Sequence, residues 1–168
     1  MNFRNILYAL TCLSFSAIIG AAIYEHTALW PAAFSEVPKS LSVFQGPYRL
    51  DAAMFWMFVH PVTLLLFVIT LVISWKTNRR RHLLIAIGGY VVILLATFSF
   101  FVPELLELTG TPYSHTVDAS LQSRASRWVT LSLIRLAVLI VLAMNLLLGL
   151  TKPEHGMEDH QSSEVVAR

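Results

Sequence analysis

Residues 20–31 read GAAIYEHTALWP and join a hydrophobic segment directly to an acid and an imidazole. The segment that leads into them, residues 6–24, has no charged side chain, and roughly 20 apolar residues are enough for a helix to cross a bilayer. Glu25 and His26 therefore stand at the end of a predicted membrane span, where ionisable side chains are costly and usually functional. We expect other parts of the chain to supply polar groups that meet them.

The composition indicates an integral membrane protein. Of the 168 residues, 56% are hydrophobic and only 13% are charged, which is far from the average of soluble proteins. Lipid cannot satisfy backbone polar groups, so the long apolar runs predict helices. A net charge of +2 gives no indication of nucleic-acid binding. Cys12 is the single cysteine and cannot form an intrachain disulfide.

Apolar runs predict an all-α bundle of four membrane-spanning helices, in one transmembrane domain over residues 1–151. The spans cover about residues 6–24, 52–75, 83–102 and 128–150, with Pro103 marking the end of the third. Residues 152–168 are charged and predict a disordered cytoplasmic tail. A cleaved signal peptide is the alternative for the first span, because small residues 20–22 follow its apolar core.

Two further features predict how the spans pack. The small residues Ala9, Cys12, Ser16 and Gly20 recur every three or four positions and predict a face for close helix packing. The connection 27–50 is rich in apolar residues, so it is expected to fold back as a lid or to lie at the interface as a simple loop. Trp30 and Tyr48 would then lie at headgroup depth.

The basic turn at residues 76–81 is the strongest indication of orientation, because loops rich in Lys and Arg stay cytoplasmic. This rule places both termini in the cytoplasm, and we expect the protein in a bacterial inner membrane. The cytoplasmic side then has seven basic residues against four outside: Arg4, Lys76, Arg79, Arg80, Arg81, Lys152 and Arg168, against Lys39, Arg49, Arg124 and Arg127.

With this topology, polar groups from all four spans fall in the outer half of the bilayer. Glu25 and His26 lie at the outer end of the first span, and Glu104 lies at that of the third. His60 and Arg135 each lie about eight residues inward, or roughly 12 Å at the helical rise per residue. Because an unpaired arginine at this depth is expensive, we expect Glu25 or Glu104 to pair with Arg135 in an outer polar pocket.

Two kinds of chemistry fit this pocket. Carboxylates and imidazoles ligate iron, zinc or copper, although the spacing matches no established metal motif. Without a metal, His26 or His60 would remove a proton from a bound molecule. Glu25 would orient the imidazole, and Arg135 would stabilise the resulting anion. No flavin, nicotinamide or nucleotide motif is visible, and apolar surroundings favour a hydrophobic small molecule.

The candidate residues therefore fall into two groups. The catalytic candidates are Glu25, His26, His60 and Arg135, and the substrate-binding candidates are Trp30, Trp56, Glu104 and Trp128.

Three features resemble a four-helix membrane family of mostly unknown function that includes the anthrone oxygenases. They are the Glu25-His26 pair, Pro103 at the end of the third span, and Trp128 followed by Arg135 in SRWVTLSLIRLAVL. The resemblance implies functional roles for Glu25, His26, Trp128 and Arg135, and dioxygen as the oxidant of a polycyclic phenol or a related aromatic molecule. Ser132 departs from the family pattern, which has a histidine there, and so does Glu104 after the proline.

A non-enzymatic protein is the alternative class. It would bind a small ligand or an ion, or serve as a structural partner in a membrane complex, and homo-oligomers are compatible with either class. In this alternative the ionisable residues form a hydrogen-bond network that holds the bundle together.

Overall fold

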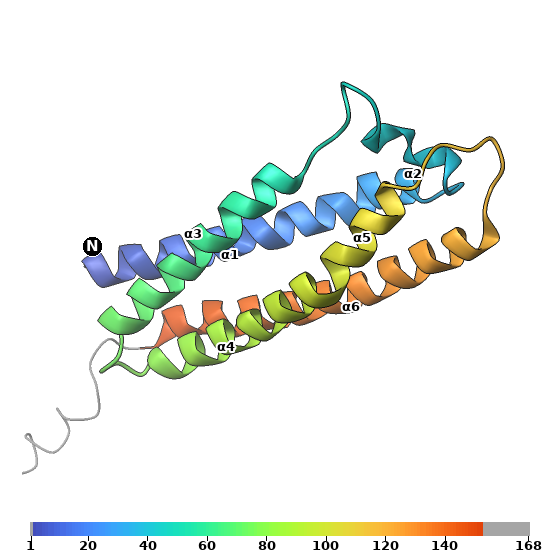
Figure 1. Cartoon of the computed structure of the whole chain (residues 1–168). Helices are drawn as coiled ribbons and strands as arrows, with labels where there is room; N and C mark the ends of the chain where they lie inside the picture. The colour runs from blue at the N-terminus through green and yellow to red at the C-terminus, as the bar shows by residue number, and fades with distance from the viewer. Residues whose placement is uncertain (1, 153–168) are drawn as a thin grey trace, which may run out of the picture.

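The protein is a bundle of four long helical rods, seen here in a computed structural model that describes residues 2–152 (Figure 1). Its helical stretches Phe3–Ala33, Ala53–Ile73, Arg80–Thr109 and Ala119–Thr151 are each long and apolar enough to cross a membrane. The predicted all-α, four-span fold is confirmed, and the chain is an integral multi-pass membrane protein. The predicted tail spans residues 152–168, and all of it after Lys152 lies outside the described part.

The rods contain short π- and 3₁₀-helical segments. In chain order the elements are α1 (Phe3–Tyr24), π-helical η1 (Glu25–Leu29), α2 (Trp30–Ala33), 3₁₀-helical η2 (Lys39–Phe44), α3 (Ala53–Ile73), α4 (Arg80–Ala96), π-helical η3 (Thr97–Phe101), α5 (Val102–Thr109), α6 (Ala119–Leu148) and 3₁₀-helical η4 (Gly149–Thr151).

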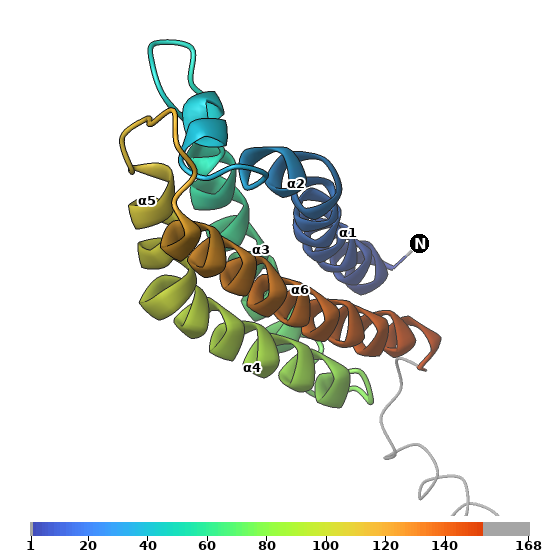
Figure 2. The same ribbon diagram turned by 90° about the vertical axis from the view of Figure 1, so that its right-hand side faces the viewer.

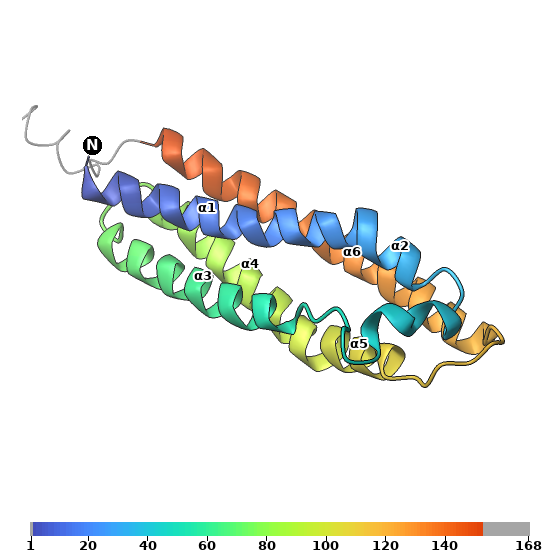
Figure 3. The same ribbon diagram turned by 90° about the horizontal axis from the view of Figure 1, so that it is seen from above.

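The rods run alternately up and down the bundle. Helix α1 packs against α3 and α6, and α4 packs against both of these helices as well (Figures 1 and 2). The start of α1, the turn at residues 74–79 and the end of α6 lie at one end, which we call the basic end (Figure 3). Elements α2, η2 and α5 lie at the opposite end, which we call the loop end.

Three of the rods continue past a proline: Pro31, Pro61 and Pro103. The prediction that Pro103 ends the third helix was wrong, because α5 continues to Thr109, and the first rod likewise runs through Pro31 to Ala33. At Pro31 and Pro103 a five-residue π turn ends two residues before the proline. Each of these two prolines thus stands in the first turn of the next helical segment, where its missing N–H and fixed φ are tolerated.

Thr63, Thr70 and Ser74 repeat at helical spacing in the second predicted span, which predicts that their side faces the protein, and in α3 it does. Thr63 and Thr70 are fully buried at 0% and 1% exposure. Their hydroxyl groups lie 2.6 Å from Ser14 Oγ and 2.7 Å from Thr11 Oγ1 of α1. These pairs satisfy polar groups where water is absent, and they fix how α1 and α3 pack together.

The predicted small-residue face of α1 was wrong. Ala9, Ser16 and Gly20 are exposed on the bundle surface, and of this stripe only Cys12 is buried. The buried side of α1 instead contains large side chains such as Phe15, which packs edge-on against aromatic rings of α3 and α4. Bulky rings fill the space between these helices, so close backbone approach is not what joins them.

The connection after α2 folds back onto the loop end. Val37 and Leu41 are fully buried, and the backbone N–H of Val37 donates to Gln122 Oε1 of α6 at 2.9 Å. Tyr48 is fully exposed, whereas Trp30 is only 4% exposed inside an apolar cluster. The burial follows from the continued helix, which directs Trp30 inward. A lid role for this connection stays a prediction.

The close approach of α1 and η4 makes Gly149 a test of the bundle. A Cβ at Gly149 would collide with the Tyr8 hydroxyl group, which is buried and donates to the Leu146 carbonyl at 2.8 Å. We expect Gly149→Ala to lower the free energy of unfolding by about 1–3 kcal/mol, measured by SDS titration in mixed micelles. Gly88→Ala is the control, because a Cβ there meets nothing within 4 Å. Equal stability of both variants would contradict this packing.

Candidate functional site

The candidate site is centred on Arg135, in the middle of α6. Its Nη1 donates to Thr97 Oγ1 at 3.1 Å, and its guanidinium carbon lies 4.3 Å from the centre of the Phe101 ring. Both contacts come from the π turn η3, so this irregular turn forms the binding surface for the guanidinium group. π turns inside α-helices are frequently found at functional sites.

Three predicted catalytic residues lie around Arg135. Glu25, His26 and His60 are each within electrostatic range of its guanidinium group, and we refer to these four residues as the polar cluster. They come from the π turn η1 and from the helices α3 and α6. Within residues 2–152, Arg135 makes no contact ion pair with a carboxylate. Glu25 thus faces Arg135 at longer range rather than in a salt bridge.

Glu25 is instead held by a neutral donor. Trp56 Nε1 donates to Glu25 Oε1 at 2.9 Å, and the Trp56 ring stacks on His60 at a centroid distance of 5.3 Å. His60 Nδ1 in turn lies 2.6 Å from the hydroxyl group of the fully buried Tyr90. A continuous line of contacts therefore joins Glu25 to α4 through two side chains of α3.

His26 has both ring nitrogens occupied within the bundle. Its Nδ1 is 2.8 Å from the Ala22 carbonyl, which can only accept a hydrogen bond, so Nδ1 is the protonated donor. In the neutral imidazole, Nε2 therefore accepts from the Ser132 hydroxyl group at 2.5 Å. The prediction that Glu25 orients a histidine is not what the geometry shows for His26, because the Ala22 carbonyl does so.

Ser132, Thr97 and Tyr90 are site residues to which the sequence analysis gave no role. Ser132 lies one helical turn before Arg135, and Tyr90 lies two helical turns before Thr97 in the third predicted span. These regular spacings put them on the inward faces of their helices. A search for hydroxyl groups at helical spacing from the charged residues would have found all three.

Two of the predicted tryptophans, Trp30 and Trp128, pack against each other beside the polar cluster. Trp128 Nε1 donates to the Phe101 carbonyl at 2.9 Å, and its ring is nearly parallel to that of His26. Trp30 packs edge-on against Trp128 at 5.0 Å and also lies close to Glu25. Its buried Nε1 has no partner at normal hydrogen-bond distance among the described residues. The Glu25 carboxylate is the acceptor with which it interacts at longer range.

Glu104 lies outside this group. Its two carboxylate oxygens accept from Nε and Nη2 of Arg124, both at 2.9 Å, and Arg124 also contacts Glu107 at 2.7 Å. The prediction that Glu104 can serve as the partner of Arg135 was wrong. Because the helix continues past Pro103, Glu104 lies further toward the loop end and opposite Arg124 of α6.

Loss of the indole donor should weaken the site. Trp56→Phe would leave Glu25 Oε1 without its hydrogen bond, and an unsatisfied buried polar group costs about 1–3 kcal/mol. We expect the free energy of unfolding in mixed micelles to fall by about this amount. Trp75→Phe is the matched control, because Trp75 is half exposed and makes no hydrogen bond through its side chain within the described chain. A similar small effect of both substitutions would show that Trp56 does not stabilise Glu25.

The described residues do not form a cluster of metal ligands. Over residues 2–152, no three side chains of His, Cys, Asp or Glu come together as a metal site. The catalytic and substrate-binding roles of the predicted residues stay predictions. Comparison of the chain with protein-family models, curated proteins and solved structures gave no match.

Proposed function

We propose that the polar cluster is the active site of a membrane oxidoreductase that oxidises a small hydrophobic aromatic molecule, in the manner of the anthrone oxygenases. One observation carries the proposal: Glu25 is the carboxylate within electrostatic range of Arg135 inside an apolar bundle, yet the two side chains form no contact ion pair among the described residues. Opposite charges in such surroundings attract strongly, so a structural role would favour their direct contact. A polar group of a ligand placed between them would be stabilised by interactions with both side chains.

The surrounding donors suit a ligand with a developing oxyanion. A guanidinium group has five N–H donors, and only one hydrogen bond from Arg135 is formed within the described residues. Trp30 Nε1 is a further donor near Glu25, with which it interacts only beyond normal hydrogen-bond distance. Donors already in place where negative charge develops are the strongest means of stabilising it. The rings of Trp30 and Trp128 would bind a flat apolar ring of the ligand.

Proton removal is assigned to His26. The Ala22 carbonyl fixes its tautomer, so Nε2 is the basic nitrogen, and the Ser132 hydroxyl group occupies it in the absence of substrate. His26 would take the proton from the activated carbon or the phenol through this hydroxyl group or after displacing it. Arg135 would stabilise the resulting anion.

The oxidant of the proposed reaction is dioxygen, as the family resemblance implies. A methylene group of the substrate loses two hydrogen atoms and gains one oxygen atom, which becomes the new carbonyl group. The second oxygen atom leaves with the two hydrogens as water, so the step is balanced without another reductant.

The activity can be tested with purified protein, anthrone and dissolved oxygen. We expect oxygen uptake with anthraquinone as product. Glu25→Gln and Arg135→Gln should each lower the rate by at least about a hundredfold and leave the melting temperature nearly unchanged. Glu107→Gln and Arg127→Gln are matched controls near the loop end and should keep full activity. Absence of both binding and oxygen uptake in the wild type would overturn the proposal.

A structural network is the second candidate, and a specific observation favours it. Glu25, His26 and His60 each already have a neutral hydrogen-bond partner inside the bundle. If this network only stabilises the fold, Glu25→Gln and Arg135→Gln should lower the melting temperature, and no ligand should bind. The two candidates therefore make opposite predictions about the same variants.

A further inference from the structure

The charges of the described chain are separated between its two ends. All acidic residues within residues 2–152 lie in the half toward the loop end: Glu25, Glu36, Asp51, Glu104, Glu107 and Asp118. At the basic end, the charged side chains of the described residues are all basic: Arg4, Lys76, Arg79, Arg80, Arg81 and Lys152. Such an excess of positive charge at one membrane face attracts anionic lipid headgroups.

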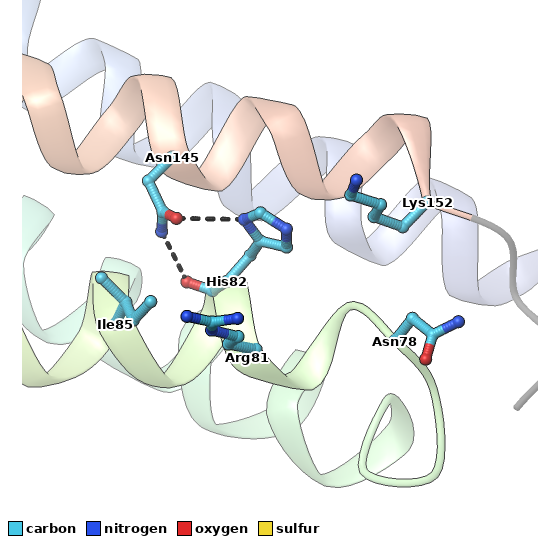
Figure 4. A pocket seen from close by; sticks show the side chains of 6 residues that line it. All are labelled: Asn78, Arg81, His82, Ile85, Asn145 and Lys152. Atoms are coloured by element: carbon cyan, nitrogen blue, oxygen red, sulfur yellow. Dashed lines mark hydrogen bonds between the residues drawn. The ribbon is translucent and has the colours of Figure 1, made fainter. Parts of the chain in front are cut away.

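The basic end also contains a hollow between α4 and the end of α6. It has a volume of about 560 Å³ and is lined by Asn78, Arg81, His82, Ile85, Asn145 and Lys152 (Figure 4). No carboxylate of residues 2–152 lines it. Because it opens where the helices end, it lies at the depth of the headgroups and not of the acyl chains.

One wall of this hollow is rigid. Asn145 Nδ2 donates to the His82 carbonyl at 2.9 Å, and Asn145 Oδ1 lies 3.0 Å from His82 Nδ1 (Figure 4). This double contact fixes the imidazole against α6. It also sets His82 Nδ1 as the donor to Asn145, because an amide oxygen only accepts.

The two cations of the hollow are free to bind an anion. The side chains of Arg81 and Lys152 make no hydrogen bond or ion pair with another described residue, and both are exposed. Helix α4 begins at Arg80, with no acidic residue in its first turn. The positive end of its dipole therefore adds to the charge of the two side chains.

We propose that this hollow binds the phosphate of one acidic phospholipid. Arg81 and Lys152 would hold the phosphate oxygens from opposite sides, since one extends from α4 and the other from the end of α6. Ile85 lies one turn further into the bilayer on the same helix and is exposed, so it would contact the first carbons of an acyl chain. A free phosphate would lack that contact.

The test measures lipid binding to the full-length protein in nanodiscs of phosphatidylcholine. Phosphatidylglycerol is titrated in, and bound lipids are counted by native mass spectrometry. At about 1 kcal/mol per basic side chain, the double variant Arg81→Gln with Lys152→Gln should bind about thirtyfold more weakly. Neither side chain is buried, so the fold should persist, which circular dichroism would check.

The matched control removes the same charge from the same end but outside the hollow, by Lys76→Gln with Arg80→Gln. It should lower the affinity by less than about threefold, since the two charges act only at a distance. Equal losses in both double variants would mean diffuse attraction and would overturn the proposal. Inorganic phosphate is titrated in a separate arm, in nanodiscs without acidic lipid. Binding as tight as that of the lipid would assign the hollow to a free anion and would also overturn it.

Discussion

The rest of the loop-end half depends on one constraint, which is the placement of a guanidinium group at membrane depth. Arg135 cannot reach water along its own helix without crossing several apolar turns, so the protein must supply its surroundings. It does so with a hydroxyl group and an aromatic face, both from η3. Phe101 offers the negative face of its ring to the cation, a contact that is stronger when the groups are desolvated.

The two π turns are the backbone response to this constraint. A π turn inserts an extra residue into the helix and rotates everything after it, which shifts the faces that point inward. In η1 it places Glu25 and His26 beside α3 and α6, and in η3 it places Thr97 and Phe101 under Arg135. The proline that follows each turn is tolerated at the start of the next segment. Two rods thus use the same local structure at the site, which is a π turn followed by any residue and then a proline.

Composition and periodicity were enough to predict the four helices and the inward side of α3. Apolar runs of sufficient length leave few alternatives in lipid, and the threonines of α3 repeat at helical spacing. The sequence could not predict that the helices pass Pro31 and Pro103, because a proline normally marks a helix end and a π turn has no recognisable residue pattern. The error moved Glu104 toward Arg135 in the prediction, whereas the continued helix places it beside Arg124.

The depth of the ionisable groups could be counted along each helix, but their partners could not. Charge suggested a salt bridge, yet the observed partners are all neutral: Trp56 for Glu25, Ser132 for His26, Tyr90 for His60 and Thr97 for Arg135. A neutral donor or acceptor holds a side chain in place without cancelling its charge. A direct ion pair between Glu25 and Arg135 would cancel both charges and leave little field for a ligand. By fixing each group separately, the bundle holds Glu25 and Arg135 apart in an apolar region, so the two side chains do not form the salt bridge that their charges suggested.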